Sequence, residues 1–260
     1  MLNELQNLLK NFKSVLIAFS GGVDSTFLLK VAKDVLGDNV LAIIAKSPTY
    51  PDSEAKFAQN WCEGEGVRYE VIETDEFSDE NFLANPRERC YFCKKELFSK
   101  LLEIAQKNNI PYVLDGSNFD DKSDFRPGTK AKEELGVRSP LMELGFTKED
   151  IREGARDLGL GVWDKPSYAC LASRIPYGTK ITKEILGRIE KGEEYLKSLG
   201  FNQLRVRHHN AIVRIEVEPE ALAELLDDDL RGQIAKKFEE LGYTYVTFDL
   251  KGYRTGSMNL

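Results

Sequence analysis

The stretch Val15-Leu16-Ile17-Ala18-Phe19-Ser20-Gly21-Gly22-Val23-Asp24-Ser25-Thr26 decides the fold of the first part of the chain. Its apolar first half predicts a buried strand, and a helix is predicted over Ser25–Leu36. The two glycines allow positive φ and a close approach to a ligand, and the exposed amides of a helix start favour an anion. We therefore predict a phosphate-binding loop, with hydroxyls of Ser20, Ser25 and Thr26 beside the amides. The alternative is a plain glycine turn.

The loop lacks the lysine of a Walker A motif, because no Gly-Lys-Ser or Gly-Lys-Thr follows it. The six residues Ser20–Ser25 resemble the PP-loop of the ATP pyrophosphatases, which cleave ATP between the α and β phosphates and adenylate an oxygen of the substrate. The resemblance implies Mg²⁺ and an ATP site formed by Ala18, Ser20, Gly21, Gly22, Asp24, Ser25, Gly116 and Arg126. Asp24 is a candidate catalytic residue that positions the magnesium, although a carboxylate there can also cap the helix.

Composition limits the class of protein. The 260 residues suffice for two domains, and 42% hydrophobic with 30% charged residues is typical of a soluble globular protein. The apolar run at 15–19 is too short for a secretory leader, and no stretch approaches the ~18 apolar residues that cross a bilayer. Four cysteines do not make a disulfide framework. We therefore expect a cytoplasmic protein with no membrane partner, and the net charge of −7 disfavours nucleic acid as the main partner.

Up to about residue 165, short β-rich runs alternate with longer amphipathic segments, which is typical of βαβ units. The fold class expected is α/β, with a doubly wound parallel sheet. After the first strand and helix, strands are predicted over 40–45, 67–73 and 111–115, and helices over 52–64, 87–108 and 147–158. The residues Asp115–Asn118 should lie at the carboxyl edge of the sheet, where such folds bind ligands, and 117–129 is interpreted as a functional loop.

A change of composition near Pro176-Tyr177-Gly178 predicts a domain boundary. We expect a PP-loop ATP pyrophosphatase domain over 1–175 and a smaller α/β domain over 176–260 that serves substrate binding or oligomerisation. Within the second domain we predict a helix over 182–199, a β-hairpin of 203–208 and 211–217, one or two helices over 219–241 and a strand over 243–250.

The cysteines fall into two groups. Cys90 and Cys93 form a C-x₂-C pair, and Cys170 lies between the predicted domains. Two thiolates three residues apart on one helix face can hold a metal ion or one edge of an iron–sulfur cluster. Two buried thiols or a zinc knot are the alternatives. Cys62 has no partner nearby in sequence and is interpreted as packing.

The residues around these cysteines resemble one family. Asn85-Pro86-x-x-Arg89-Cys90-Tyr91-x-Cys93-Lys94 and Trp163-Asp164-Lys165-Pro166-Ser167-x-Ala169-Cys170-Leu171-Ala172-Ser173-Arg174-Ile175-Pro176-Tyr177-Gly178 are similar to the LarE family of ATP-dependent sulfur transferases. The matches extend from about residue 15 to 215. The resemblance implies adenylation of the carboxylates of pyridinium-3,5-biscarboxylic acid mononucleotide and their conversion to thiocarboxylates, for the nickel-pincer nucleotide cofactor of lactate racemase.

The resemblance also implies two ways to deliver the sulfur. Members with only the cysteine at position 170 give up that sulfur and keep dehydroalanine. Members with all three cysteines hold a [4Fe-4S] cluster that carries an extra sulfide, which requires a sulfide donor. Because Cys90, Cys93 and Cys170 are all present, the cluster version is favoured, with Cys170 as a catalytic residue and Arg174 or Lys165 lowering its thiol pKa.

A nucleotide with two carboxylates requires cations. The candidates for substrate binding are Arg174, Arg205 and Arg207, of which the last two share one face of a predicted strand. Their alternative is a solvated strand face that pairs with Glu216 or Glu218. Glu193 and Glu194 are interpreted as a solvated helix face, and a contact with the metal or the substrate is the alternative. The run Asp227–Asp229 is interpreted as a helix cap.

Three other functions stay open from the sequence. A tRNA thiolation enzyme would need a basic, aromatic surface. An ammonia-using ligase would leave the block around Cys170 unexplained. A nucleotide sensor would bind ATP without releasing pyrophosphate. We also expect a homo-oligomer.

Overall fold

The computed structural model describes residues 1–123, 127–166, 169–254 and 258, and the chain divides into two compact units. Unit 1 comprises residues 1–82 and 86–167, and unit 2 comprises 83–85 and 168–260. The main division therefore falls earlier than the expected boundary after residue 175. Asn85 explains part of the difference, because its side-chain amide donates to the carbonyls of Pro176, at 2.8 Å, and Thr179, at 3.1 Å. This ties residues 83–85 to unit 2.

Unit 1 contains a parallel sheet with the strand order β3-β2-β1-β4. Its strands are β1 (Val15–Ala18), β2 (Val40–Lys46), β3 (Arg68–Glu73) and β4 (Tyr112–Leu114). The chain moves outward from β1 to β3 and then returns to the other side of β1. The topological switch point therefore lies between β1 and β4, where open α/β sheets bind ligands at the carboxyl ends of the strands.

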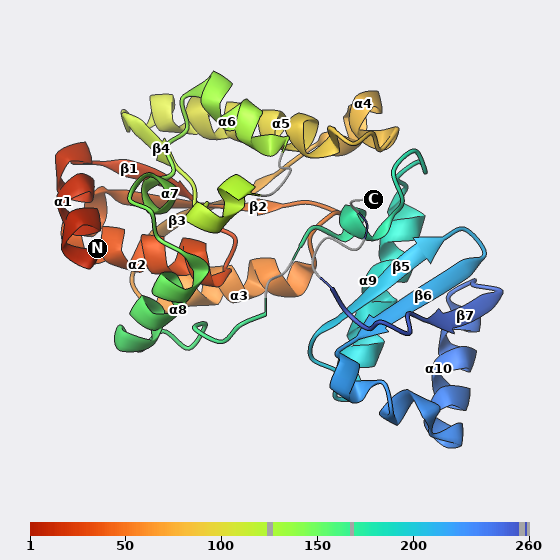
Figure 1. Ribbon diagram of the computed structural model, residues 1–260. Helices are drawn as coiled ribbons and strands as arrows, with labels where there is room; N and C mark the ends of the chain where they lie inside the picture. The colour runs from red at the N-terminus through yellow and green to blue at the C-terminus, as the bar shows by residue number, and fades with distance from the viewer. Residues whose placement is uncertain (124–126, 167–168, 255–257, 259–260) are drawn as a thin grey trace. The chain divides into compact units, whose positions relative to one another are not determined.

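Helices cover both faces of this sheet (Figure 1). Val15 and Ile17 of β1 join the hydrophobic core beneath α1 (Leu2–Phe12), α2 (Val23–Leu36) and α8 (Lys148–Asp157). Leu16 joins a second core with Phe98 and Leu101 of α5 (Arg89–Lys107). This alternation confirms the doubly wound α/β class. The helices are α1 (Leu2–Phe12), α2 (Val23–Leu36), α3 (Asp52–Gly64), α4 (Glu80–Leu83), α5 (Arg89–Lys107), α6 (Gly128–Leu135), α7 (Pro140–Glu143) and α8 (Lys148–Asp157).

Unit 2 is a smaller α/β unit. Strands β5 (Leu204–His209) and β6 (Ile212–Val217) are antiparallel, and β7 (Tyr245–Phe248) runs parallel to β6. The predicted hairpin is confirmed, with Asn210 in its turn at φ 55°. Helices α9 (Lys183–Ser198) and α10 (Asp228–Glu240) pack on this sheet (Figure 1).

Most differences from the predicted elements lie at their ends. The predicted helix 52–64 is confirmed, whereas the helix predicted from residue 87 begins at Arg89. The predicted loop 117–129 contains a 3₁₀ turn, Phe119–Ser123, and the start of α6. That helix was not predicted because Pro127 and Gly128 look like turn residues, although Pro is favourable beside a helix start.

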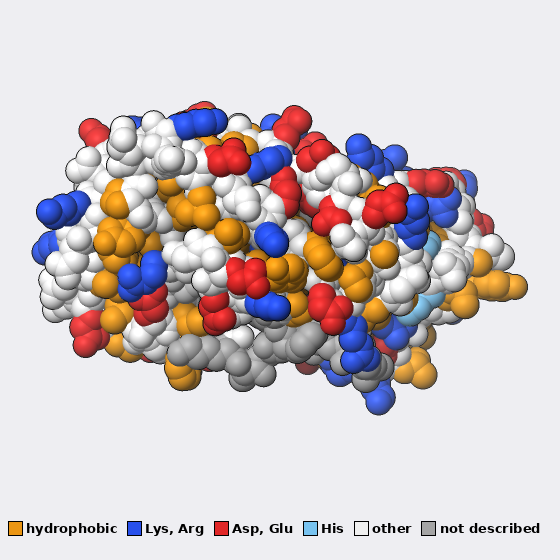
Figure 2. Space-filling view, turned by 90° about the horizontal axis from the view of Figure 1, so that it is seen from above, with side chains coloured by type: hydrophobic (Ala, Val, Ile, Leu, Met, Phe, Trp, Pro, Cys, Tyr) orange, Lys and Arg blue, Asp and Glu red, His pale blue; other side chains and the backbone are white. Residues whose placement is uncertain are grey.

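The surface carries both signs of charge. On the face drawn in Figure 2, Lys and Arg side chains are interspersed with Asp and Glu side chains. Among the helices in the described part of the chain, none is both long and apolar enough to cross a membrane.

Candidate functional site

The predicted phosphate loop lies at the carboxyl end of β1, beside the switch point. Gly21 adopts φ +71°, and a Cβ there would lie 3.0 Å from the ring of Phe57. A larger residue is therefore disfavoured both by the backbone conformation and by the close contact. The first backbone amide of α2 that forms an intrahelical hydrogen bond is that of Thr26, which donates to the Gly22 carbonyl at 2.9 Å. The earlier amides of the first turn precede any intrahelical acceptor and are suited to an anion.

The loop hydroxyls bond mainly to one another. The hydroxyls of Ser20 and Ser25 lie 3.1 Å apart, and Ser25 also donates to the Gly22 carbonyl at 3.1 Å. Thr26 is fully buried, and its hydroxyl has no hydrogen-bond partner among the described residues. The serine hydroxyls therefore lie at the loop, whereas that of Thr26 is enclosed by the protein.

Asp24 is bound by a cation from α8. Its two carboxylate oxygens lie 2.8 and 2.7 Å from Nζ of Lys148, and the Asn118 amide donates to one of them at 3.4 Å. Gly116 packs against the same helix start, since a Cβ there would lie 2.8 Å from the Ser25 nitrogen. Ala18 ends β1 directly before the loop. These residues thus gather around the first turn of α2.

A buried polar network fixes the end of β4. Lys132 Nζ lies 3.1 Å from the carboxylate of Asp115 and donates to Ser117 at 2.7 Å. Ser139 donates to Asp115 at 2.5 Å, and Ser117 does so at 2.8 Å. Burial acts to raise the pKa of Asp115, but Lys132 and the two hydroxyls outweigh it and hold the pKa below its ordinary value. The network places Gly116 firmly beside the loop.

A second lysine holds the loop backbone. Nζ of Lys165 donates to the Gly21 carbonyl at 3.1 Å and to Glu54 at 2.8 Å, and it lies 3.9 Å from the centre of the Phe57 ring. All three partners belong to the loop or to α3. Lys165 therefore fixes the loop conformation, a role that the sequence analysis did not assign to it.

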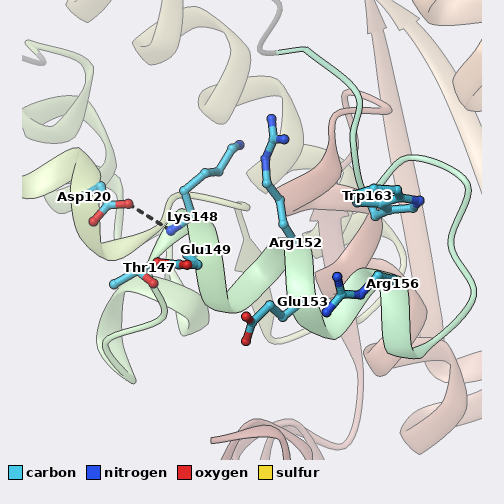
Figure 3. A pocket seen from close by; sticks show the side chains of 8 residues that line it. All are labelled: Asp120, Thr147, Lys148, Glu149, Arg152, Glu153, Arg156 and Trp163. Carbon is cyan, nitrogen blue, oxygen red and sulfur yellow. Dashed lines mark hydrogen bonds between the residues drawn. The ribbon is translucent and has the colours of Figure 1, made fainter.

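A cavity of about 650 Å³ lies along α8 (Figure 3). Lys148, Arg152 and Arg156 are spaced by four residues and so share one face of this helix. The lining carries both signs of charge, and Lys148 connects it to the loop through Asp24. Its residues are Asp120, Thr147, Lys148, Glu149, Arg152, Glu153, Arg156 and Trp163.

The four cysteines differ in environment, and none is in a disulfide. Cys62 is buried as predicted, and burial raises the pKa of its thiol to about 12. Cys90 is exposed and Cys93 half-buried in the first turn of α5, while Cys170 is half-buried in unit 2. In the described part of the chain, no three His, Cys, Asp or Glu side chains are grouped to hold a metal ion.

Arg174 is buried in unit 2. Its guanidinium forms a two-pronged ion pair with Glu193 at 2.8 and 3.0 Å and donates to the carbonyls of Ala169 and Cys170 at 2.6 and 3.1 Å. The interpretation of Glu193 as solvated is wrong, because that side chain is only 2% exposed. Burial would raise the pKa of Glu193, but Arg174 outweighs it and lowers the pKa. The pair holds the segment around Cys170 onto α9.

The strand arginines are also buried. Arg207 donates to one oxygen of Glu216 at 3.0 and 2.8 Å and to the Ser173 carbonyl at 3.2 Å. Arg205 donates to the Leu204 carbonyl at 2.6 Å and stacks on the Tyr253 ring at 4.9 Å. The pairing with Glu216 was the alternative kept open for these arginines. Arg126, expected at the ATP site, lies outside the described residues.

Sequence reasoning missed Lys148 as a partner of the loop. The signal available was Thr147-x-x-Asp150, a capping box that the structure contains. It fixes the helix start directly before Lys148.

Asp227 was expected to cap α10 and does so, accepting from the Leu230 amide at 2.9 Å.

The fold and the loop define a PP-loop ATP pyrophosphatase, and the family model described as NAD synthase matches residues 3–111. The chain is 41% identical over 252 residues to the pyridinium-3,5-bisthiocarboxylic acid mononucleotide synthase of Lactiplantibacillus plantarum, covering 96% of this chain and 91% of the relative. The chain therefore belongs to the LarE family of ATP-dependent sulfur transferases.

Two further relatives match along nearly their whole length. An uncharacterized protein of Synechocystis sp. is 45% identical over 260 residues, which is 99% of this chain and 97% of the relative. An uncharacterized protein of Methanocaldococcus jannaschii is 32% identical over 253 residues, which is 97% and 95%. The similarity thus includes unit 2 as well as the loop domain.

Proposed function

We propose that this protein adenylates the carboxylates of pyridinium-3,5-biscarboxylic acid mononucleotide with ATP and converts them to thiocarboxylates, in the biosynthesis of the nickel-pincer nucleotide. The observation that carries the proposal is the 41% identity over 96% of the chain to a synthase whose name gives the thiocarboxylated product. The loop at the switch point supports it, because converting a carboxylate oxygen into a leaving group needs an activated phosphate.

The first step forms an acyl adenylate. A carboxylate oxygen of the substrate bonds to the α phosphorus, the bond to the β-phosphate oxygen breaks, and pyrophosphate leaves. The amides of the first turn of α2 and the hydroxyls of Ser20 and Ser25 bind the phosphates, and Gly116 packs beside them. Asp24 offers the oxygen donors that Mg²⁺ prefers, and the ammonium already at this carboxylate indicates that the position suits a cation. Magnesium would neutralise charge on the departing pyrophosphate.

The second step replaces AMP with sulfur. A sulfide attacks the carbonyl carbon of the acyl adenylate, AMP leaves, and a thiocarboxylate remains. The proposed ligands of a [4Fe-4S] cluster are Cys90, Cys93 and Cys170, three thiols that lie outside any disulfide and are not fully buried. Such a cluster would supply the extra sulfide, which an external donor must replace after each turnover.

The sacrificial route is the alternative at the same residue. The Cys170 thiolate would attack the acyl adenylate and release AMP, giving a thioester. Removal of the Cα proton then breaks the Cβ–S bond, so that the substrate keeps the sulfur and the chain keeps dehydroalanine. The half-buried position of Cys170 is compatible with this route as well.

The arginines of unit 2 have two different proposed roles, substrate contact and positioning of the segment around Cys170. We assign Arg205 and Arg207 to the substrate oxyanions; Arg207 would bind the substrate while it stays paired with the buried Glu216. Arg174 acts as a positioning residue, since its guanidinium is engaged with Glu193 and the carbonyls around Cys170. Arg126 stays a proposed contact of the ATP phosphates. We also propose a cytoplasmic homo-oligomer.

The activation step is tested by measuring pyrophosphate and AMP with ATP and Mg²⁺, with and without the biscarboxylated nucleotide. Release that depends on the nucleotide, with thiocarboxylate found by mass spectrometry when sulfide is present, supports the proposal. Asp24→Asn should reduce both products, whereas Asp38→Asn, at an exposed carboxylate that pairs with Lys33, should not. Release driven by ammonia or tRNA instead would contradict the proposal.

The cluster assignment has a separate test. After anaerobic reconstitution, the visible absorbance of such a cluster should be lost in Cys90→Ala and in Cys93→Ala. Cys62→Ala is the matched control, because this thiol is enclosed in the core. Full absorbance in the Cys90 and Cys93 variants would remove them as ligands.

A further inference from the structure

We propose that Lys148 binds the β and γ phosphates of ATP. Without ATP its ammonium is paired with the Asp24 carboxylate, and Mg²⁺ replaces the ammonium there when ATP binds. The inference rests on the proposed function, because ATP is the ligand. It supplies the cation that the loop sequence itself lacks, since no lysine occurs between Ser20 and Thr26.

Among the described residues, two lysines contact the loop, and one of them has an exchangeable partner. Lys165 is bound to a backbone carbonyl, to Glu54 and to the Phe57 ring, so moving it would release the loop itself. Lys148 is held by Asp24 alone among its recorded side-chain partners in the described residues. The loop conformation therefore does not require the Lys148 side chain to stay where it is.

The pair of Lys148 and Asp24 is suited to exchange. Their side chains are 30% and 22% exposed, so water screens the attraction and part of the hydration is retained. Phosphate oxygens offer stronger, charge-assisted hydrogen bonds to an ammonium. A divalent cation in turn binds the Asp24 carboxylate more strongly than the ammonium does. Mg²⁺ and the phosphates arrive together, so both partners of the pair are replaced at once.

The backbone of Lys148 is fixed beside the loop. Its amide donates to Asp120 at 2.8 Å, and the capping box joins Thr147 to Asp150 at 2.8 and 3.2 Å. Ile151 and Ala155 of α8 are fully buried in the core shared with α2. A side chain with four rotatable bonds on a fixed helix start can change its partner without moving the helix.

A second cation stands on the same face of α8. Arg152 rises from the helix on the same side as Lys148 in Figure 3 and lines the same cavity. Its Nη2 donates to the backbone carbonyl of Lys165 at 3.2 Å, the residue whose side chain holds the loop. The cavity is lined by three carboxylates as well as three cations, so the positive charge that meets the departing pyrophosphate is that of the Lys148 ammonium itself. No bond to Lys148 forms or breaks, and its proton stays on Nζ.

The test compares ATP with AMP, which lacks the β and γ phosphates. By calorimetry with Mg²⁺, Lys148→Met should weaken ATP binding at least about tenfold and leave AMP binding unchanged. Lys148→Arg should recover part of the loss, and inorganic pyrophosphate should follow ATP. Lys30→Met is the matched control, because Lys30 lies on α2 with a similar exposure of 23% and pairs only with Asp34 and Glu65 among the recorded ion pairs of the described residues.

Equal losses for ATP and AMP, or no loss for either, would overturn the assignment and leave Lys148 as a structural ion pair. Lys148→Gln is the second variant if the Met variant does not fold. The readout is binding, so it is independent of sulfur transfer. If the wild type forms thiocarboxylate but Lys148→Met keeps the wild-type ratio of ATP affinity to AMP affinity, this inference alone is refuted. If Lys148→Met lowers that ratio but the wild type forms no thiocarboxylate, only the proposed function is refuted.

Discussion

Two ion pairs, one in each unit, differ in burial and geometry. Lys148 and Asp24 at the ATP loop are 30% and 22% exposed, whereas Arg174 and Glu193 in unit 2 are 0% and 2% exposed. In the loop pair, the ammonium of a flexible lysine side chain binds a carboxylate. In the pair of unit 2, a planar guanidinium binds both carboxylate oxygens and is excluded from solvent. The difference indicates that the cation at the loop can change partners, while the cation in unit 2 fixes a shape.

The largest expected effect concerns the sealed pair. Arg174→Met leaves the Glu193 carboxylate buried without its cation and should lower the free energy of unfolding of unit 2 by about 3–5 kcal/mol. Urea unfolding followed by circular dichroism measures it. Arg188→Met is the control, since Arg188 forms an exposed pair with Glu184 on the same helix, at 2.6 Å, and should lose less than about 1 kcal/mol. Equal losses of unfolding free energy in Arg174→Met and Arg188→Met would show that burial does not make the Arg174 pair more important for stability.

The next effect separates substrate binding from ATP binding. Arg207→Ala removes one of the cations that pair with the buried Glu216, so unit 2 should lose stability; in the folded protein the change should weaken binding of the biscarboxylated nucleotide by about 1.5–3 kcal/mol, because a charge-assisted contact is lost, and leave ATP binding intact. Calorimetry measures both ligands. Arg231→Ala, at an arginine that is 52% exposed and pairs with Asp228, should change neither. Unchanged substrate affinity in Arg207→Ala would defeat that assignment.

The stability that the buried pair of Arg174 and Glu193 contributes should depend on pH. The pKa of Glu193 is lowered in the folded protein by Arg174, which overcomes burial. The stability from this pair is therefore present above the unfolded pKa of about 4.3 and is lost as the pH falls through the folded value. The difference in unfolding free energy between the wild type and Glu193→Gln should shrink in that acid range. A difference independent of pH would show that Glu193 does not titrate with folding.

The smallest expected effect is at the loop. Lys148→Met should change the free energy of unfolding by less than about 1 kcal/mol, because the pair it removes is partly solvated. Thermal and urea unfolding of the ligand-free protein measure it. A loss as large as that of Arg174→Met would mean that Lys148 is structural, and the contrast between the units would disappear.

The sequence was sufficient where the signal is local. Gly21 and Gly22 follow an apolar run, and that order alone located the strand, the loop and the helix start. Lys148 lies 124 residues from Asp24 along the chain, so no periodicity could pair them. The capping box before Lys148 showed only where a helix begins.

Glu193 shows a signal that was available and not used. Leu186, Ile189 and Leu196 are buried on α9, and Glu193 falls on the same stripe at helical spacing. A carboxylate on an apolar stripe requires a buried partner, which Arg174 supplies from outside the helix. Its identity could not be predicted, because it depends on how the segment around Cys170 packs against α9.

Counting the products per chain distinguishes cluster-dependent transfer from sacrifice of Cys170. The protein is reconstituted anaerobically with iron and sulfide, and thiocarboxylate is then counted per chain in the presence of ATP, Mg²⁺, sulfide and the biscarboxylated nucleotide, together with the intact mass of the chain. Several products per chain with an unchanged mass are expected of a cluster-dependent sulfur transferase. At most one product, with the chain lighter by one H₂S, would contradict this account and make Cys170 the sulfur donor.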